Sequence, residues 1–191
     1  MAVYLGSLDH LQGIDLLLRV AKRMEARVPA MKFLIMGGPE ESSWRQRFHG
    51  AEVRNCIFTG VISREEAPRY LSLGIVAVSL KRSDSMQANG KLLDYMAMGL
   101  PVVAFDTLAN REILGDKGCL VSEGDTDRVT TALESLAGTA SLRRELGEAL
   151  RTRAVALFSR EVRGNELIGL YREMVESGEG KKKTNRHYYR R

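Results

Sequence analysis

The sequence predicts an α/β domain with a doubly wound, mostly parallel, six-stranded sheet and a helical carboxyl-terminal segment. Short, β-branched apolar runs alternate with helical patterns, and the runs are apolar throughout, as in parallel strands that are covered on both faces. The length agrees, because 191 residues suffice for one such domain and are too few for two. We expect residues 1–178 to form this domain and residues 179–191 to be a basic, disordered tail.

Six runs along the chain are typical of strands, and each ends near Gly, Ser, Asp or Thr. They cover residues 2–5, 32–36, 56–59, 75–80, 102–105 and 119–122. No further strand is expected after residue 122, so the remainder of the chain is predicted to be helical.

Helical patterns fill the spaces between these runs. Apolar residues repeat at helical spacing from Ile14 to Met24, and Ser63 and Glu66 form a capping box before a short helix. Further helices are predicted at residues 91–98 and 126–136. A final helix is expected after Ser159, with an apolar face at residues 167, 168, 171, 174 and 175 that requires a packing partner.

The formal charge of +5 belongs to the tail rather than to the domain. Residues 180–191 hold six Lys and Arg and no acid, which leaves −1 for residues 1–179. A near-neutral body argues against nucleic-acid binding, and truncation after Gly180 should abolish any such binding through the tail. The tail is also basic enough to contact anionic lipid headgroups, although a disordered, solubilising end explains it equally well.

The cysteine pattern and the hydropathy indicate a cytoplasmic protein. Cys56 and Cys119 are lone thiols in apolar stretches, which predicts neither a disulfide framework nor a zinc site. The amino terminus lacks a signal-peptide pattern, and no apolar run approaches the roughly 20 residues of a membrane span. We therefore expect a cytoplasmic chain, membrane-peripheral at most through its tail, with no metal and no cofactor.

Ligands of a doubly wound sheet bind at the carboxyl ends of the strands, so the loops there hold the candidate site. These loops are expected at residues 6–12, 37–39, 60–63, 81–91 and 106–112. In the first loop Gly6 follows a strand and Gly13 begins a helix, which would leave free N–H groups and a positive helix end for a phosphate. A plain β-α turn explains these glycines as well. His10 lies in the same loop, where it is either a phosphate contact or a solvated residue.

The loop after the fourth strand carries the most information. It is polar up to Asn89 and Gly90, and the next helix begins with Lys91, with Asp94 one turn further on. A phosphate over the helix start and a diol bonded to Asp94 would satisfy both charged groups. Alternatively, Asp94 only complements the helix dipole and Lys91 is solvated.

At this point the sequence resembles a known family. YLGSLDHLQGIDLLLRVAK, KFLIMGGPEE, IFTGVISREEAPRYLSLG, KLLDYMAMGLPVVAFDT and NREILGDKGCLVSEGD occur in the order seen in the carboxyl-terminal domain of group 1 glycosyltransferases with the GT-B fold. The resemblance runs from about residue 2 to residue 175. It implies the donor-binding half of an enzyme that moves a sugar from a nucleotide-diphosphate sugar to an acceptor, with retention. The acceptor-binding, amino-terminal domain or subunit would then be missing.

The resemblance assigns roles to the candidate residues. The last acid of the family's E-x7-E motif falls on Asp94, which implies a contact with the ribose. Gly60, Val61 and Ile62 resemble the stretch whose backbone contacts the nucleobase, and residues 107–112 border the same crevice. The donor phosphates would lie against the first loop and the helix start, at Gly6, Ser7, Gln12, Gly13, Asn89, Gly90 and Lys91.

Three positions depart from the family pattern. Met86 stands where the first acid of the motif is expected, and Asp84 and Gln87 are out of register. Ser7 and Gln12 replace the usual Arg and Lys of the phosphate loop, which leaves Lys91 as the best remaining cation. The loss of a charge-assisted contact costs about 1.5 to 3 kcal/mol. These departures leave open a second hypothesis, a catalytically inactive nucleotide-sugar-binding or scaffold subunit of a split glycosyltransferase.

Overall fold

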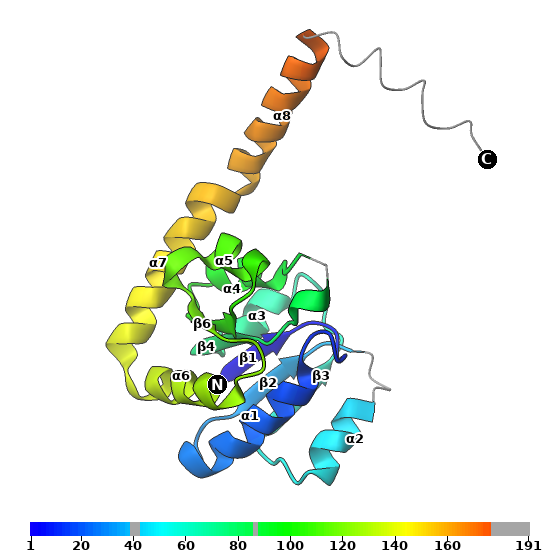
Figure 1. Ribbon diagram of the computed structural model, residues 1–191, viewed down its shortest axis with the longest axis vertical. Coiled ribbons are helices and arrows are strands. Elements are labelled where there is room, and N and C mark those ends of the chain that lie inside the picture. The colour runs from blue at the N-terminus through cyan, green and yellow to red at the C-terminus, as the bar shows by residue number, and fades with distance from the viewer. Residues whose placement is uncertain (39–42, 86–87, 177–191) are drawn as a thin grey trace, which may run out of the picture. The chain divides into compact units, whose positions relative to one another are not determined.

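The computed structural model describes residues 1–38, 43–85 and 88–176 (Figure 1). The chain divides into two compact units, Met1–Arg153 and Ala154–Arg191. Within the described ranges, no helix is long and apolar enough to cross a membrane. The predicted boundary at residue 178 and the basic tail lie outside the described residues.

The first unit contains one sheet of six parallel strands in the order β3-β2-β1-β4-β5-β6. The strands are β1 (Ala2–Leu5), β2 (Phe33–Met36), β3 (Cys56–Gly60), β4 (Val76–Ser79), β5 (Val102–Phe105) and β6 (Cys119–Val121). All six are within one or two residues of the ranges predicted from the sequence. The doubly wound fold class is therefore confirmed.

The helices of the first unit connect these strands. They are α1 (Ile14–Arg27), α2 (Ser43–Gly50), α3 (Ala67–Leu71), α4 (Lys91–Ala97), α5 (Leu108–Leu114) and α6 (Thr126–Gly138). α1 and α6 pack against each other, as Figure 1 shows, whereas α4 packs against α5 and β5. Every residue of β2, β4 and β5 is buried, as expected for strands that are covered on both faces.

The order of the strands changes direction at β1, which pairs with β2 on one side and with β4 on the other. In open α/β sheets, such a switch point opens a crevice at the carboxyl ends of the strands. The segments that follow β1, β3 and β4 therefore flank the candidate site.

Two local signals in the sequence are confirmed by hydrogen bonds. The Ser63 N–H donates to Glu66 Oε2 (3.0 Å), and the Glu66 N–H donates to Ser63 Oγ (3.2 Å), which closes the capping box before α3. In the second unit, the Val162 N–H donates to Ser159 Oγ (3.3 Å) at the start of α8 (Arg160–Glu176). α8 follows α7 (Ala140–Phe158), and none of its residues is buried.

One expectation about the loops was wrong. Residues 106–112 were expected to be a loop, but α5 begins at Leu108. The side chain of Thr107 caps this helix by accepting a hydrogen bond from the Asn110 N–H (3.2 Å). The buried residues of this helix are Asn110 and Leu114, and the polar Asn110 hides the apolar repeat that would indicate a helix in the sequence.

Candidate functional site

Lys91, at the start of α4, reaches across to the loop that follows β1. Its Nζ donates to Gln12 Oε1 (2.7 Å) and lies 4.5 Å from the centroid of the Tyr4 ring. Gly6 leaves the room that this amine needs, because a Cβ on Gly6 would lie 2.7 Å from Lys91 Nζ. The structure thus brings together Lys91, Gly6 and Gln12, three of the residues that the sequence proposed for phosphate binding.

The surroundings of Lys91 lower the pKa of its ammonium group. Burial, and to a smaller extent the charge of Lys81, lower the pKa of Lys91 from 10.5 to about 7, while Asp9 opposes both effects. An anion bound beside Lys91 would favour the charged form. The charge of this group near neutral pH therefore depends on whether a ligand is present.

Three backbone donors of the first loop are engaged within the chain itself. The Gln12 N–H donates to Asp9 Oδ1 (2.9 Å), and the N–H groups of Gly13 and Ile14 donate to the carbonyl oxygens of His10 (3.0 Å) and Asp9 (3.4 Å). The chain uses these donors to close its own turn ahead of α1. These three N–H groups are therefore not free for a phosphate, which increases the part that Lys91 would play in holding an anion here.

Ion pairs fasten the same loop to the segment after β4. Arg82 Nη2 lies 2.8 Å from Asp15 Oδ2, and Arg82 Nε donates to the His10 carbonyl (3.1 Å). The imidazole of His10 lies 3.4 Å from Asp15 Oδ1. Through these contacts His10 and Arg82 hold two loops of the crevice together.

Tyr95 fixes α4 against the carboxyl end of β1. Its side chain is fully buried, and its hydroxyl accepts a hydrogen bond from the Leu5 N–H (2.8 Å), at the end of β1. In the sequence, a tyrosine at a buried helix position is indistinguishable from an ordinary core residue. Its contact with Leu5 sets the position of the helix that carries Lys91 and Asp94.

Asn89 lies in a buried polar network rather than in open space. It is 2% exposed, and its Nδ2 donates to Ser79 Oγ (3.0 Å) and to Asn110 Oδ1 (2.8 Å). Asn110 Nδ2 in turn donates to the Phe105 carbonyl (2.8 Å). The network joins the ends of β4 and β5 to the segment before α4, and the sequence analysis did not identify Asn110 as part of it.

Replacing Asn110 by leucine is expected to destabilise the first unit by about 2 kcal/mol or more. The variant removes one of the two acceptors of the buried Asn89 amide and one of the two donors to the Phe105 carbonyl, and a buried donor hydrogen left unpaired costs about 1 to 3 kcal/mol. Urea unfolding monitored by circular dichroism would measure the change. Asn165→Leu, at an exposed position of α8, is the matched control. Equal stability of the two variants would contradict the structural role of the network.

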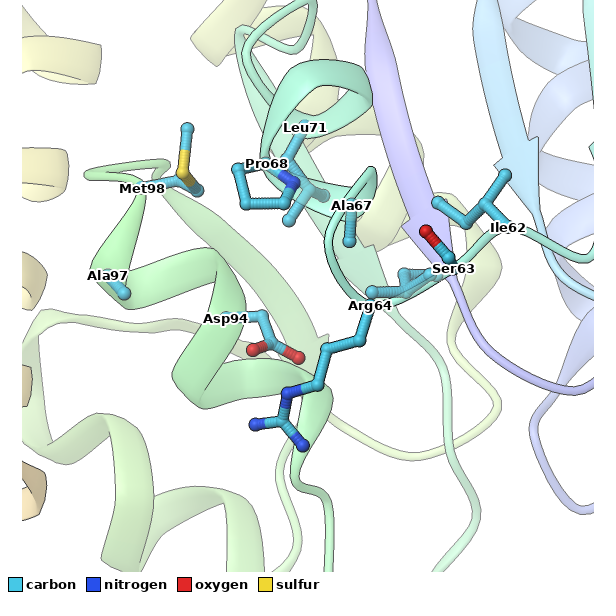
Figure 2. A pocket seen from close by; sticks show the side chains of 10 residues that line it. Ile62, Ser63, Arg64, Ala67, Pro68, Leu71, Asp94, Ala97 and Met98 are labelled. Atoms are coloured by element: carbon cyan, nitrogen blue, oxygen red, sulfur yellow. The ribbon is translucent and has the colours of Figure 1, made fainter. Parts of the chain in front are cut away.

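A cavity of about 390 Å³ lies between α3 and α4, within the size range of small-ligand sites. Figure 2 shows its lining, in which the carboxylate of Asp94 points toward the guanidinium of Arg64. The cavity is lined by Leu5, Ile62, Ser63, Arg64, Ala67, Pro68, Leu71, Asp94, Ala97 and Met98. Ile62 and Asp94, which were predicted to contact the nucleobase and the ribose, thus face one cavity.

The electrostatics of the cavity depend on two opposite charges. Partial burial raises the pKa of Asp94, and the charge of Arg64 opposes that shift. A ligand that brings hydroxyl donors to Asp94 would favour the carboxylate form. The sequence analysis passed over Arg64, because a lone arginine beside a capping box resembles any solvated surface charge.

The other residues that were predicted for the site do not line this cavity. Gly60 does not line the cavity, and its carbonyl accepts a hydrogen bond from the Gly37 N–H (2.8 Å). Val61 is 68% exposed, and Ser7 is exposed and accepts the Tyr4 hydroxyl at its carbonyl (2.6 Å). A Cβ added to Gly90 would meet no atom within 4 Å.

The remaining candidate positions belong to the segment between β4 and α4. Asp84 is exposed in a short 3-10 turn, whereas Met86 and Gln87 lie outside the described residues. Within the ranges that the structure describes, no three His, Cys, Asp or Glu side chains are grouped so that they could hold a metal ion. Burial raises the pKa of the Cys56 thiol to about 12, which makes it unreactive near neutral pH.

Residues 1–139 match the family model described as glycosyl transferases group 1. Among curated relatives, the chain is 26% identical over 178 residues to alpha-D-kanosaminyltransferase of Streptomyces kanamyceticus. That alignment covers 91% of this chain and 46% of the enzyme. The chain spans about half the length of the curated relatives that it matches.

Solved structures share the fold. The carboxyl-terminal domain of a group 1 family glycosyl transferase from Francisella tularensis matches with a TM-score of 0.71 at 18% identity, covering 83% of this chain and 85% of that chain. A TarM mutant from S. aureus, solved with fondaparinux, alpha-GlcNAc-glycerol and UDP, matches with a TM-score of 0.78 at 21% identity, covering 89% of this chain and 35% of that chain. At such identities the likeness concerns the fold alone.

Proposed function

Since this chain belongs to the group 1 glycosyltransferase family and has the fold of a carboxyl-terminal domain of that family, we propose that it is the donor-binding half of a glycosyltransferase. Its ligand is a nucleotide-diphosphate sugar, whose sugar is transferred to an acceptor with retention. The acceptor is held by another domain or subunit, in agreement with the half-length match to the curated relatives.

One observation carries the proposal. A single short helix, α4, presents Lys91 to the loop after β1 and Asp94 to a nucleoside-sized cavity one turn further along. The cation is suited to a diphosphate, and the carboxylate is suited to the hydroxyl groups of a ribose. Lys91 therefore contacts the phosphates of the ligand, and Asp94 contacts its nucleoside. The two parts of the ligand meet beside Leu5, where β1 ends.

The chemistry of transfer follows from what Lys91 can do. When the bond between the sugar and the diphosphate breaks, negative charge develops on the departing nucleoside diphosphate. A cation already placed beside that charge stabilises the transition state without reorganisation. Because acceptor-side groups belong to the missing half, the 191-residue chain alone should transfer sugar slowly or not at all.

Asp94→Asn tests the nucleoside end of the site. The variant removes a charged acceptor while keeping the size of the side chain, so we expect UDP to bind about 10- to 100-fold more weakly. Binding of inorganic pyrophosphate, which has no ribose, should be unchanged. Isothermal titration calorimetry measures both ligands, with Asp116→Asn, at an exposed position before β6, as the control. An equal loss for UDP and pyrophosphate would contradict the assignment of Asp94 to the ribose.

A second candidate function is a nucleotide-sugar-binding or scaffold subunit without catalytic activity. Ser7 and Gln12 stand where the family pattern has cations, and Gln12 Oε1 engages the remaining lysine. Titration of the chain with UDP, GDP and their sugars separates the alternatives. Absence of binding to all of these ligands would favour the scaffold and refute donor binding.

A further inference from the structure

The cavity between α3 and α4 holds a cationic side chain that the proposed function leaves unused. Of the described residues that line it, Arg64 is the one with a positive charge. It belongs to the turn before α3, directly after Ile62 and Ser63, and Figure 2 shows its guanidinium extending across the cavity toward Asp94 of α4. A ligand in this cavity therefore lies between the carboxylate of Asp94, which accepts hydrogen bonds, and the long side chain of Arg64, which donates them.

Among the side chains around the cavity, Arg64 is the main donor. The Ser63 N–H donates to the Glu66 carboxylate, and Ser63 Oγ accepts from the Glu66 N–H, so both groups take part in the capping box. The other side chains of the lining are apolar apart from Asp94. Asp94 is the acceptor that suits ribose hydroxyls, so Arg64 is the side chain that can donate to the base.

A guanidinium has five N–H donors and no acceptor, so it pairs with the carbonyl edge of a base and not with an amino group. In DNA recognition the same preference makes arginine a partner of guanine O6 and N7. We propose that Arg64 determines which donor nucleotide is bound, and that it selects bases with a keto oxygen at pyrimidine position 4 or purine position 6. The favoured ligands are then uridine and guanosine diphosphate sugars, over those of cytidine and adenosine. This inference rests on the proposed donor site.

The test compares four nucleotides on the 191-residue chain by calorimetry: UDP, CDP, GDP and ADP. The unmodified chain should bind UDP over CDP, or GDP over ADP, by about 10-fold or more, as expected where a charged donor meets a carbonyl oxygen on one base and an amino group on the other. Arg64→Gln should reduce that preference to less than about threefold, mainly by weakening the keto nucleotides.

Arg69→Gln is the matched control, because it removes the same charge from an exposed position on α3. Arg64→Lys adds a second readout, since it keeps the charge but loses the planar, five-donor guanidinium, and it should reduce the preference. An unchanged preference in Arg64→Gln would overturn the inference, and so would an equal loss for all four nucleotides. Failure of the unmodified chain to bind any of them would instead overturn the donor site itself.

Discussion

Lys91→Met is expected to weaken UDP binding by about 10- to 100-fold. Hydrogen bonds from charged groups contribute about 1.5 to 3 kcal/mol, and the amide donors around Gly13 are already used by the loop itself. Lys117→Met, at an exposed position before β6, is the control for loss of a lysine. Full affinity in Lys91→Met would show that the phosphates are bound elsewhere.

The titration of Lys91 predicts that the affinity for UDP depends on pH. With a pKa of about 7 in the free protein, Lys91 is half charged at neutral pH, and the bound diphosphate raises its pKa. Binding then takes up a proton, so affinity should fall roughly fivefold between pH 7 and pH 8. Calorimetry in buffers of different ionisation enthalpy measures this uptake directly. Lys91→Met should show no such uptake in this range, and persistence of the uptake in that variant would assign it to another group.

Gly13→Ala is expected to produce the largest loss of stability. Gly13 has a left-handed φ of 71°, and a Cβ there would lie 2.0 Å from the Leu80 carbonyl oxygen. A non-glycine residue in this backbone region costs about 1 to 3 kcal/mol, and displacement of the Leu80 backbone adds to that cost. We expect a decrease of more than about 2 kcal/mol in the free energy of unfolding.

Chemical denaturation monitored by circular dichroism measures this decrease. Gly138→Ala, where an added Cβ meets no atom within 4 Å, serves as the control and should change the stability little. Equal stability of Gly13→Ala and the control would contradict the close contact between Gly13 and the Leu80 carbonyl after β4.

Much of the fold could be predicted because its signals are local. Each strand is apolar for at least its first three residues, and the capping box at Ser63 and the cap at Ser159 use residues three positions apart. α5 was missed because one of its two buried residues is the polar Asn110, so no apolar repeat marks the inner face of this helix.

The site could be predicted in part. The sequence identified Lys91, Gly6 and Gln12, which the structure brings together, and it identified Ile62 and Asp94, which face one cavity. Each of these lies at the end of a strand or at the start of a helix. The topology of a doubly wound sheet requires such positions to meet at one edge.

Other features of the site depend on contacts between distant segments. The capture of the Gln12 N–H by Asp9, the buried pair Asn89 and Asn110, and the reach of Arg64 toward Asp94 leave no mark in local composition. The sequence by itself determined the sheet, its connections and the residues at its carboxyl edge, since apolar periodicity and caps act over a few positions. Only the tertiary structure decided which donors remain available and how far the pKa of Lys91 falls. Hydrogen-bond competition and desolvation are properties of the packed surroundings, not of the order of residues.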